Sequence, residues 1–469
     1  MVFSGIPFLY YFLPCVLLAY FVVPGKAKNA VLLIASLLFY AWGEPVYVLL
    51  MLLTILIGFL AGIGMERSIE RSWRVFTPGR ILTGSIFVFL GIFVYFKYMD
   101  FFISNLNNWF GVGIPLLQIA LPIGISFYTF QIISYLVDVY RGEVSAQKNI
   151  ILLATYIAMF PQLIAGPIVR YSSIEEQINR RFITWSGAED GISRFIIGLS
   201  KKVLIANELG ELCDIFRASA DKSVFFYWMY AAAFMLHIYF DFSGYSDMAI
   251  GLGRLFGFVF PENFNYPYIA GSITEFWRRW HMTLGSWFRD YVYIPLGGNR
   301  VSKIKWYRNI FLVWMLTGFW HGASWNFVVW GLYFGVLLII EKNWLMQYLE
   351  NSKWIKHIYV LILVMFSFVI FNATDITQAV QDITCMFGGG NLPLFSRETG
   401  YYLRSYGITI FAAGIGCTPL IGKCVRRSEG LGKEGLRKIT KIVILVALLI
   451  LSTAYLVDGS FNPFLYFRF

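Results

Sequence analysis

The sequence predicts an all-α integral membrane protein, and three features of its composition lead to that prediction. Hydrophobic residues make up 58% of the 469 positions, charged residues make up only 14%, and the mean hydropathy is +0.64. A soluble domain carries roughly 25% charged residues, so this chain has too few to cover itself with polar surface. Aromatic residues reach 19%, which suits two interfacial belts of Trp and Tyr. We expect a single membrane domain over residues 1–469.

Apolar runs along the chain predict the membrane-spanning helices, because a bilayer core requires a helix of roughly 17 to 25 residues. About eleven runs approach this length, although several are shorter than a full span. These runs are 8–23, 29–43, 45–63, 81–97, 114–137, 225–240, 309–321, 325–341, 357–372, 406–422 and 439–457. Two further stretches, 150–168 and 192–213, are interrupted by prolines or by a lysine pair. We expect them to be re-entrant or partly embedded, which is tolerated where protein covers the backbone.

The basic residues predict the orientation of the chain. Lys and Arg gather near 26–28, 67–80, 141–148, 170–202, 342–356 and 423–441. The opposite side offers little beyond Lys97, Arg397, Arg404 and Arg468. Cytoplasmic loops carry an excess of Lys and Arg, so we expect the first set in the cytoplasm and both termini outside. The net charge of +11 then reflects membrane topology and contact with lipid, and we expect no nucleic-acid partner.

The first apolar run has no Lys or Arg before it, and we therefore expect a retained first helix, since a secretory signal needs a basic start. The five cysteines are odd in number and show no Cys-x-x-Cys pair, which favours neither a disulfide framework nor a zinc site. The sequence contains no phosphate-binding Gly-x4-Gly-Lys-Ser/Thr loop. It also contains no His-Glu-x-x-His motif and no Gly-x-Ser-x-Gly motif. We expect no metal and no permanently bound cofactor.

His321 is the first candidate catalytic residue. It lies between two apolar helices, after Gly318 and Trp320 and before Gly322. An ionisable residue within a span is by default a functional hypothesis, because burying it unpaired is costly. The small neighbours allow a backbone or a ligand to approach closely, and Trp320 is suited to wall a narrow cavity. The alternative is a histidine satisfied by a neighbour in a packed bundle, and we favour catalysis.

His281 is the second candidate and lies in the polar and aromatic stretch 274–291. This stretch is too charged to span freely, yet it is apolar enough to dip into the bilayer from the cytoplasmic side. Guanidinium groups pair bidentately with phosphate oxygens, so the arginines here suit an anionic donor. The candidates for donor binding are Arg278, Arg279, Arg289, Trp277 and Trp320. The alternative is an interfacial helix whose arginines contact lipid headgroups.

A third group of polar residues lies within apolar segments. His237 precedes Asp241 by four positions, so on a helix the two share a face and can pair. We favour a structural pair over a catalytic one. The residues assigned to a structural or tunnel-lining role are His237, Asp241, Ser243, Asp247 and Asn326.

Several strings in these regions resemble one protein family. They are DFSGYSDMAIG at 241–251, NFNYPY at 263–268, FWRRWH at 276–281, WFRDYVYIPLGG at 287–298 and GFWHG at 318–322, with PQLIAGPI at 161–168, VFS at 2–4 and NPFLYFRF at 462–469. Together they resemble the membrane-bound O-acyltransferase superfamily (MBOAT), specifically its bacterial alginate O-acetylase-like branch. The teichoic acid D-alanyl transfer protein is a related branch. The likeness runs over essentially the whole chain.

The resemblance implies the MBOAT fold, with about eleven spans around a central tunnel that joins a cytoplasmic donor to an external acceptor. It implies that His321 is the histidine of the superfamily motif and that His281 occupies the second motif position. It further implies an extracytoplasmic polysaccharide as acceptor, as in O-acetylation of alginate or another exopolysaccharide. A partner protein of the SGNH-hydrolase type is expected to complete the transfer.

These observations predict an O-acyltransferase of the bacterial inner membrane. We expect it to move an acyl group, in the first instance acetyl, from a cytoplasmic thioester to a polysaccharide hydroxyl, directly or through the partner. The donor substrate is acetyl-CoA or an acyl-carrier thioester. His321 is expected to act as general base, and His281 to position or polarise the thioester. The alternatives are D-alanyl transfer from a carrier protein to teichoic acid, a transporter or flippase for a lipid-linked sugar, and a non-catalytic scaffold.

Overall fold

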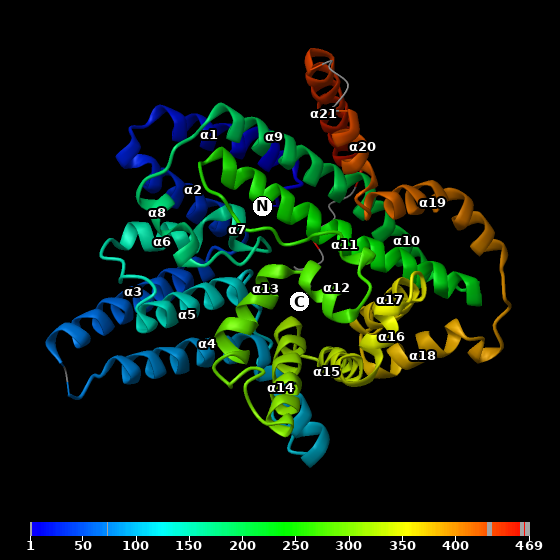
Figure 1. Ribbon diagram of the computed structural model, residues 1–469, viewed down its shortest axis with the longest axis horizontal. Coiled ribbons are helices and arrows are strands. Elements are labelled where there is room, and N and C mark those ends of the chain that lie inside the picture. The colour runs from blue at the N-terminus through cyan, green and yellow to red at the C-terminus, as the bar shows by residue number, and fades with distance from the viewer. Residues whose placement is uncertain (1, 73, 429–433, 460–463, 465–469) are drawn as a thin grey trace. The chain divides into compact units, whose positions relative to one another are not determined.

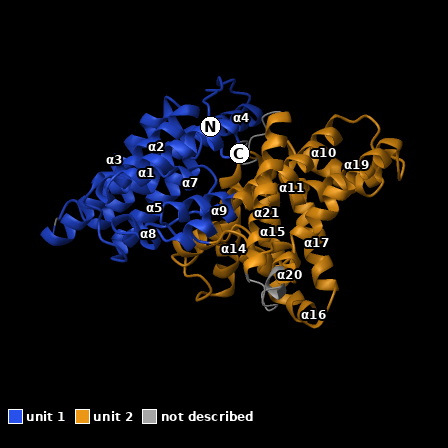
Figure 2. Ribbon diagram, turned by 90° about the horizontal axis from the view of Figure 1, so that it is seen from above, with its two compact units in different colours: residues 1–195, 248–261 blue, residues 196–247, 262–469 orange. Residues whose placement is uncertain are grey.

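The structure is a computed structural model that describes residues 2–72, 74–428, 434–459 and 464, and these residues form helices and no strand (Figure 1). Of the terminal string at 462–469, only Phe464 is described, so the predictions for the rest of that string and for Arg468 lie outside the described residues. The basic segment 423–441 likewise includes residues 429–433, which lie outside them. The chain divides into two compact units, residues 1–195 with 248–261 and residues 196–247 with 262–469 (Figure 2). The single membrane domain stays a prediction.

Five helical segments among the described residues are long and apolar enough to cross a membrane. They are Tyr47–Arg71, Pro78–Phe110, Trp325–Asn351, Ile355–Asn372 and Gly435–Asp458, and a shorter apolar helix runs over Phe8–Val22. These helices fit the predicted all-helical membrane protein. The count of eleven spans and the central tunnel stay predictions.

The first unit contains helices from the N-terminal half of the chain, and it also takes in the last residues of α11. Its elements are η1 (Phe8–Phe12), α1 (Leu13–Val22), η2 (Gly25–Ala27), α2 (Lys28–Gly43), α3 (Tyr47–Arg71), α4 (Pro78–Phe110), α5 (Ile125–Arg141), α6 (Ile150–Ala158), α7 (Phe160–Leu163), α8 (Tyr171–Asn179) and most of α9 (Trp185–Ser200).

Two predictions in this unit can be checked against the helix bounds. The span predicted at 114–137 is wrong in its first part, because α5 begins only at Ile125. Gly124 precedes it with a left-handed φ of +76°, and Pro122 also interrupts the apolar run. The stretch 150–168 is broken as expected, since Met159 has a non-helical backbone, with φ −53° and ψ 112°, between α6 and α7 and Pro161 lies in the first turn of α7, where proline is tolerated.

The second unit contains the candidate site residues. Its elements are the end of α9, η3 (Lys201–Ala206), α10 (Asn207–Ala218), α11 (Val224–Leu255), η4 (Pro267–Ile269), α12 (Ile273–Arg279), α13 (Met282–Phe288), η5 (Arg289–Tyr293), α14 (Lys303–His321), α15 (Trp325–Ile340), η6 (Glu341–Leu345), α16 (Met346–Asn351), α17 (Ile355–Asn372), α18 (Ile376–Met386), η7 (Gly389–Asn391), α19 (Arg397–Gly416), α20 (Leu420–Ser428) and α21 (Glu434–Asp458).

Helix α11 is much longer than the span predicted at 225–240. It continues through its polar residues because neighbouring segments satisfy them: Asp241 forms an ion pair with Lys202, and Asp247 forms one with Lys201. Gly244 allows the close packing, since a Cβ there would lie 2.8 Å from the carbonyl oxygen of Gly198. The predicted run 406–422 is also divided, because α19 ends at Gly416 and α20 begins at Leu420.

Candidate functional site

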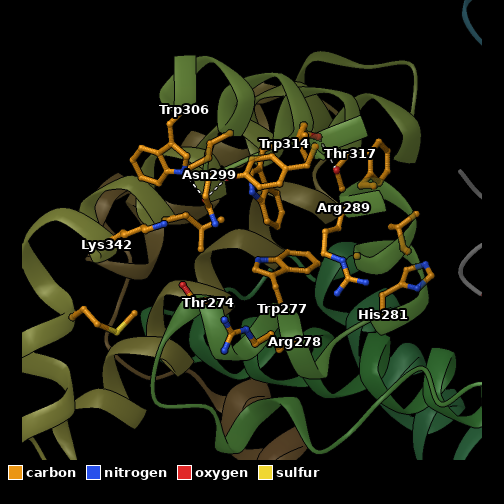
Figure 3. A pocket seen from close by; sticks show the side chains of 18 residues that line it. Thr274, Trp277, Arg278, His281, Arg289, Asn299, Trp306, Trp314, Thr317 and Lys342 are labelled. Atoms are coloured by element: carbon orange, nitrogen blue, oxygen red, sulfur yellow. Dashed lines mark hydrogen bonds between the residues drawn. The ribbon is translucent and has the colours of Figure 1, made fainter. Parts of the chain in front are cut away.

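A cavity of about 410 Å³ lies within the second unit, lined by residues of α12 to α16 and the turns between them (Figure 3). Its lining includes three cations, Arg278, Arg289 and Lys342, together with His281. Figure 3 shows His281 and Arg289 toward one side of the cavity and Lys342 toward the other. Most of the remaining lining is apolar or aromatic. Such a space suits a ligand that carries both anionic and apolar parts.

Helix α12 forms one wall of the cavity, and a buried carboxylate holds its first turn. The Glu341 side chain is fully buried and accepts hydrogen bonds from Ile273 N at 2.5 Å, Thr274 N at 3.0 Å and Thr274 Oγ1 at 2.9 Å. A carboxylate is favourable at a helix N-terminus, where backbone N–H groups lack intrahelical partners. This contact fixes the helix that carries Trp277 and Arg278.

The opposite wall is built from η5, the turn after it and the start of α14. Asn299 accepts hydrogen bonds from the Tyr293 hydroxyl at 2.6 Å and from Trp306 Nε1 at 3.1 Å. The Lys342 ammonium lies 4.7 Å from the centroid of the Trp306 ring, a cation–π contact. These contacts hold an aromatic wall with a cation at its edge.

His281 lies between α12 and α13, and its backbone is left-handed, with φ +43° and ψ +52°. This conformation is uncommon for residues other than glycine, and such strain often marks functional positions. The side chain is buried, and the Phe242 ring lies edge-on to it at 4.7 Å between centroids. Nδ1 lies 3.1 Å from Asn263 Oδ1. Burial lowers the pKa of His281 to about 3, so the imidazole is neutral near pH 7.

His321 is the last residue of α14 and is also buried. Its ring is surrounded by aromatic side chains, with centroid distances of 4.8 Å to Trp320, 5.1 Å to Trp330 and 5.2 Å to Phe371. It does not line the cavity, but Thr317, one turn earlier on the same helix, does. Trp320 contacts both histidines, since its ring lies 6.1 Å from that of His281.

The glycines near His321 allow close helix packing, as the sequence predicts. A Cβ on Gly318 would meet the carbonyl oxygen of Phe327 and lie 3.1 Å from Gly331 Cα. A Cβ on Gly331 would in turn meet the carbonyl oxygen of Trp314, and one on Gly322 would meet the Phe327 ring. Helices α14 and α15 therefore pack backbone to backbone, and this contact sets the position of His321.

The predicted donor-binding residues separate into two groups. Trp277, Arg278 and Arg289 line the cavity, whereas Arg279 and Trp320 do not. The Arg279 guanidinium bonds Glu275 Oε1 at 2.8 and 2.9 Å and the carbonyl oxygen of Asn265 at 3.0 Å, so it fastens α12 to the preceding loop. Arg289 also forms two hydrogen bonds with Asp290, at 2.6 and 3.0 Å.

The polar residues of α11 lie away from the cavity lining. His237 Nδ1 lies 2.7 Å from the carbonyl oxygen of Ala206, and Asp241 pairs with Lys202 at 2.5 Å, with both of these side chains buried. Ser243 is buried as well, and Asp247 pairs with Lys201 at 2.6 Å. His237 and Asp241 thus each contact another residue, and the pair proposed between the two stays a prediction, as does their structural role.

Asn326 has a structural contact that the sequence could not specify. It is buried, and its Nδ2 donates to the carbonyl oxygen of Ala373 at 2.9 Å, with the oxygens of Ile370 and Phe371 at 3.4 and 3.5 Å. It thus holds the end of α17, and with it the Phe371 ring that contacts His321.

Sequence reasoning missed several residues that build the site. Lys342 entered the sequence prediction only as a charge that sets orientation, and Trp306 and Asn299 were not singled out. Glu341 and Asn263 act through contacts to segments far along the chain, 67 to 68 and 17 to 20 positions away. The signal for Asn263 was its place in the NFNYPY string. Among the described residues, no cluster of three or more His, Cys, Asp or Glu could hold a metal ion.

Comparison with known proteins identifies the family. The membrane-bound O-acyltransferase family matches residues 143–377. The chain is 38% identical over 503 residues to the probable alginate O-acetylase AlgI of Azotobacter vinelandii, with 100% of both chains covered. It is 32% identical over 515 residues to the peptidoglycan O-acetyltransferase of Helicobacter pylori, covering 98% of this chain and 96% of that one. It is 31% identical over 278 residues to the teichoic acid D-alanyltransferase of Bacillus subtilis, covering 53% and 68%. The chain belongs to the membrane-bound O-acyltransferase family and is a multi-pass membrane O-acyltransferase.

Proposed function

We propose that the protein transfers an acetyl group from cytoplasmic acetyl-CoA to a hydroxyl of an extracytoplasmic polysaccharide, directly or through a partner protein. The observation that carries this proposal is the cavity of the second unit, which gathers three cations and a neutral histidine around one apolar space. The names of the relatives from Azotobacter and Helicobacter support acetyl as the group and a polysaccharide as the acceptor. The protein then resides in the bacterial inner membrane, with both termini outside.

The donor site is formed by the cavity-lining cations. Arg278 and Arg289 suit the phosphates of the donor, because guanidinium pairs bidentately with phosphate oxygens, and Lys342 supplies a third positive charge. The cavity volume of about 410 Å³ falls in the usual range for small-molecule sites, roughly 300–1,000 Å³. The indoles of Trp277 and Trp314 offer an apolar surface to the uncharged arm of the thioester.

The transfer step requires a base and a path for one proton. The acceptor oxygen attacks the thioester carbonyl carbon, a carbon–oxygen bond forms, and the carbon–sulfur bond breaks. His321 takes the hydroxyl proton and returns it to the departing thiolate, so the products are the acetyl ester and free CoA thiol. General-base assistance is typically worth ~10²–10⁴ in rate, or about 3–5 kcal/mol of barrier. A neutral imidazole is the form that can accept the proton.

A partner protein of the SGNH-hydrolase type would accept the acetyl group where the polysaccharide does not reach the site itself. In that case the attacking oxygen is a relay hydroxyl of the partner. The bond changes at the thioester are the same in both routes.

D-alanyl transfer from a carrier protein to teichoic acid is the second candidate. The similarity to the Bacillus relative favours it, but that match covers 53% of this chain, against 100% for the Azotobacter relative. The two functions differ in donor, so a carrier-bound D-alanyl thioester tested beside acetyl-CoA separates them.

The decisive experiment incubates purified protein in lipid nanodiscs with radiolabelled acetyl-CoA and a deacetylated polysaccharide. Release of CoA thiol and transfer of label are both measured, with and without the partner hydrolase. His321→Ala is expected to lower turnover by ~10²–10⁴ while the protein stays folded in the membrane. His357→Asn is the matched control, because His357 lies outside the cavity lining and its bond to the carbonyl oxygen of Ala270 can be kept by an amide. Full activity of His321→Ala would refute its assignment, and turnover only with the D-alanyl carrier would refute the acetyl donor. A transporter or scaffold would show no thioester turnover.

A further inference from the structure

Asn263 makes a dense set of contacts beside His281. Its side chain is buried, and its Oδ1 accepts from Thr283 N at 3.3 Å and from Thr283 Oγ1 at 2.9 Å, while its Nδ2 donates to Ser246 Oγ at 3.2 Å. The same Oδ1 lies 3.1 Å from His281 Nδ1. The backbone oxygen of Asn263 accepts from Met282 N at 3.0 Å. One residue therefore contacts His281 and the two residues that follow it.

These contacts determine which way the Asn263 amide is oriented. A backbone N–H can only donate, so the atom that Thr283 N approaches must be the amide oxygen. An oxygen of this kind has no proton to give. His281 Nδ1 must then be the donor in its bond to Asn263, because the two atoms are within hydrogen-bond distance and one of them must carry the proton.

We propose that Asn263 is a positioning residue that holds His281 as the Nδ1–H tautomer. Nε2 of this cavity-lining side chain is then the ring nitrogen that accepts a hydrogen bond. In a neutral imidazole one ring nitrogen donates and the other accepts, and the partner of the first selects the role of the second. His281 then cannot polarise a thioester carbonyl by donating a hydrogen bond from Nε2. It accepts a hydrogen bond instead.

The hydrogen-bond donor that fits Nε2 of His281 is an amide N–H on the uncharged arm of the thioester substrate. His281 lines the same cavity as Arg278 and Arg289, so a ligand whose phosphates pair with the arginines brings its arm past His281. This assignment rests on the proposed function, whereas the tautomer does not.

The backbone around His281 is held by the same loop. The left-handed conformation of His281 is strained and persists only where its surroundings enforce it. Two pairs of contacts do so: Asn263 bonds to residues 282 and 283, and Asn265 N donates to the carbonyl oxygen of Arg279 at 2.9 Å while the Arg279 guanidinium returns to the carbonyl oxygen of Asn265. The loop at 263–265 thus clamps the junction from both ends.

The first experiment reads the tautomer directly. The protein has four histidines, so ¹⁵N-histidine labelling gives few imidazole signals, and the His281 pair is assigned by its loss in His281→Asn. The proposal expects wild-type His281 to be protonated at Nδ1 and unprotonated at Nε2 near pH 7. Asn263→Ala is expected to shift protons to Nε2 or to give a mixture. Protonation at Nε2 in the wild type would overturn the proposal.

The second experiment measures steady-state kinetics with acetyl-CoA. Asn263→Ala is expected to raise KM for acetyl-CoA about three- to tenfold, the usual worth of one hydrogen bond, with a smaller effect on kcat. Asn263→Asp keeps an acceptor for His281 and should restore KM to within about twofold. Asn265→Ala is the matched control: it is the same substitution two positions away, on an exposed side chain, and should leave KM unchanged.

The outcomes separate this inference from the proposed function. Absence of turnover with acetyl-CoA would count against the donor, while the ¹⁵N spectrum would still support or overturn the tautomer. If Asn263→Ala does not fold, the wild-type and Asn263→Asp spectra decide. An unchanged tautomer and an unchanged KM in folded Asn263→Ala would show that Asn263 does not position His281.

Discussion

Removing the carboxylate of Glu341 should loosen α12, one wall of the cavity, without replacing any residue that lines the cavity. Glu341 begins the π-helical turn η6, which directs this side chain to the first turn of α12 while the next residue, Lys342, lines the cavity. Helix α12 has only seven residues. We therefore expect its position, and that of Arg278, to depend strongly on this one anchor.

The magnitude follows from the hydrogen bonds that Glu341 accepts. Glu341→Ala leaves the backbone N–H groups of Ile273 and Thr274 without their acceptor, and a buried donor left unsatisfied costs about 1–3 kcal/mol. Loss of the negative charge at the helix N-terminus adds about 0.3–1 kcal/mol. The sum for Glu341→Ala is about 2–7 kcal/mol. Glu341→Gln keeps one acceptor oxygen and should lose roughly half as much.

The assay combines thermal unfolding in nanodiscs with the KM for acetyl-CoA. Glu341→Ala should lower Tm and raise KM more than Glu341→Gln, because the alanine removes every hydrogen bond that Glu341 accepts from α12, the helix carrying Arg278, whereas the glutamine keeps some of them. Glu350→Ala is the control, since it removes the same charge from an exposed position nine residues later. Equal Tm and equal KM for wild type and Glu341→Ala would refute the anchoring role.

Three further perturbations test other parts of the second unit by the same unfolding assay. Gly318→Ala should destabilise by about 1–3 kcal/mol, because its methyl meets backbone of α15, whereas Gly414→Ala meets nothing within 4 Å and should be neutral; equal losses would contradict this. Lys202→Met should cost about 3–5 kcal/mol by leaving Asp241 buried without its ion pair, and adding Asp241→Leu should recover much of it, so an additive double variant would argue against the pair. Lowering the pH from about 6.5 to 3 should reduce the stability of wild type more than that of His281→Asn, because the unfolded state protonates His281 at a higher pH than the folded state does. Parallel curves of stability against pH would contradict the buried neutral imidazole.

The helical character of the chain could be predicted because apolar runs are visible in the sequence without any knowledge of tertiary contacts. The ends of the helices were harder to predict. Helix α11 was predicted to end near residue 240, where Asp241 begins a polar stretch, yet it runs on because Lys202 and Lys201 reach across to its carboxylates. The run from 114 was predicted as helix from its hydrophobicity alone, and the backbone at Gly124 shows why composition is a poor guide there: a left-handed turn ends the preceding loop and starts α5.

The sequence could predict those features of the candidate site that depend on residue type alone. Arginine beside tryptophan indicated an anion site, and Arg278, Arg289 and Trp277 do line one cavity. Arg279 carries the same charge one position later, but helical geometry turns it to Glu275 and to the loop at Asn265. Neighbouring residues on a helix point about 100° apart, so a sequence string alone cannot say which of two arginines faces the ligand.

We propose different tasks for the two histidines because their surroundings differ. His281 lines the cavity and is bonded through Nδ1, whereas His321 lies among aromatic rings one turn beyond Thr317, which is itself part of the lining. Trp320 contacts both rings, at 6.1 and 4.8 Å. A thioester held by the cavity cations would therefore pass His281 before its carbonyl approached His321. Under the proposed function, an acceptor at His281 suits binding of the uncharged arm, and a base at His321 suits the reacting hydroxyl.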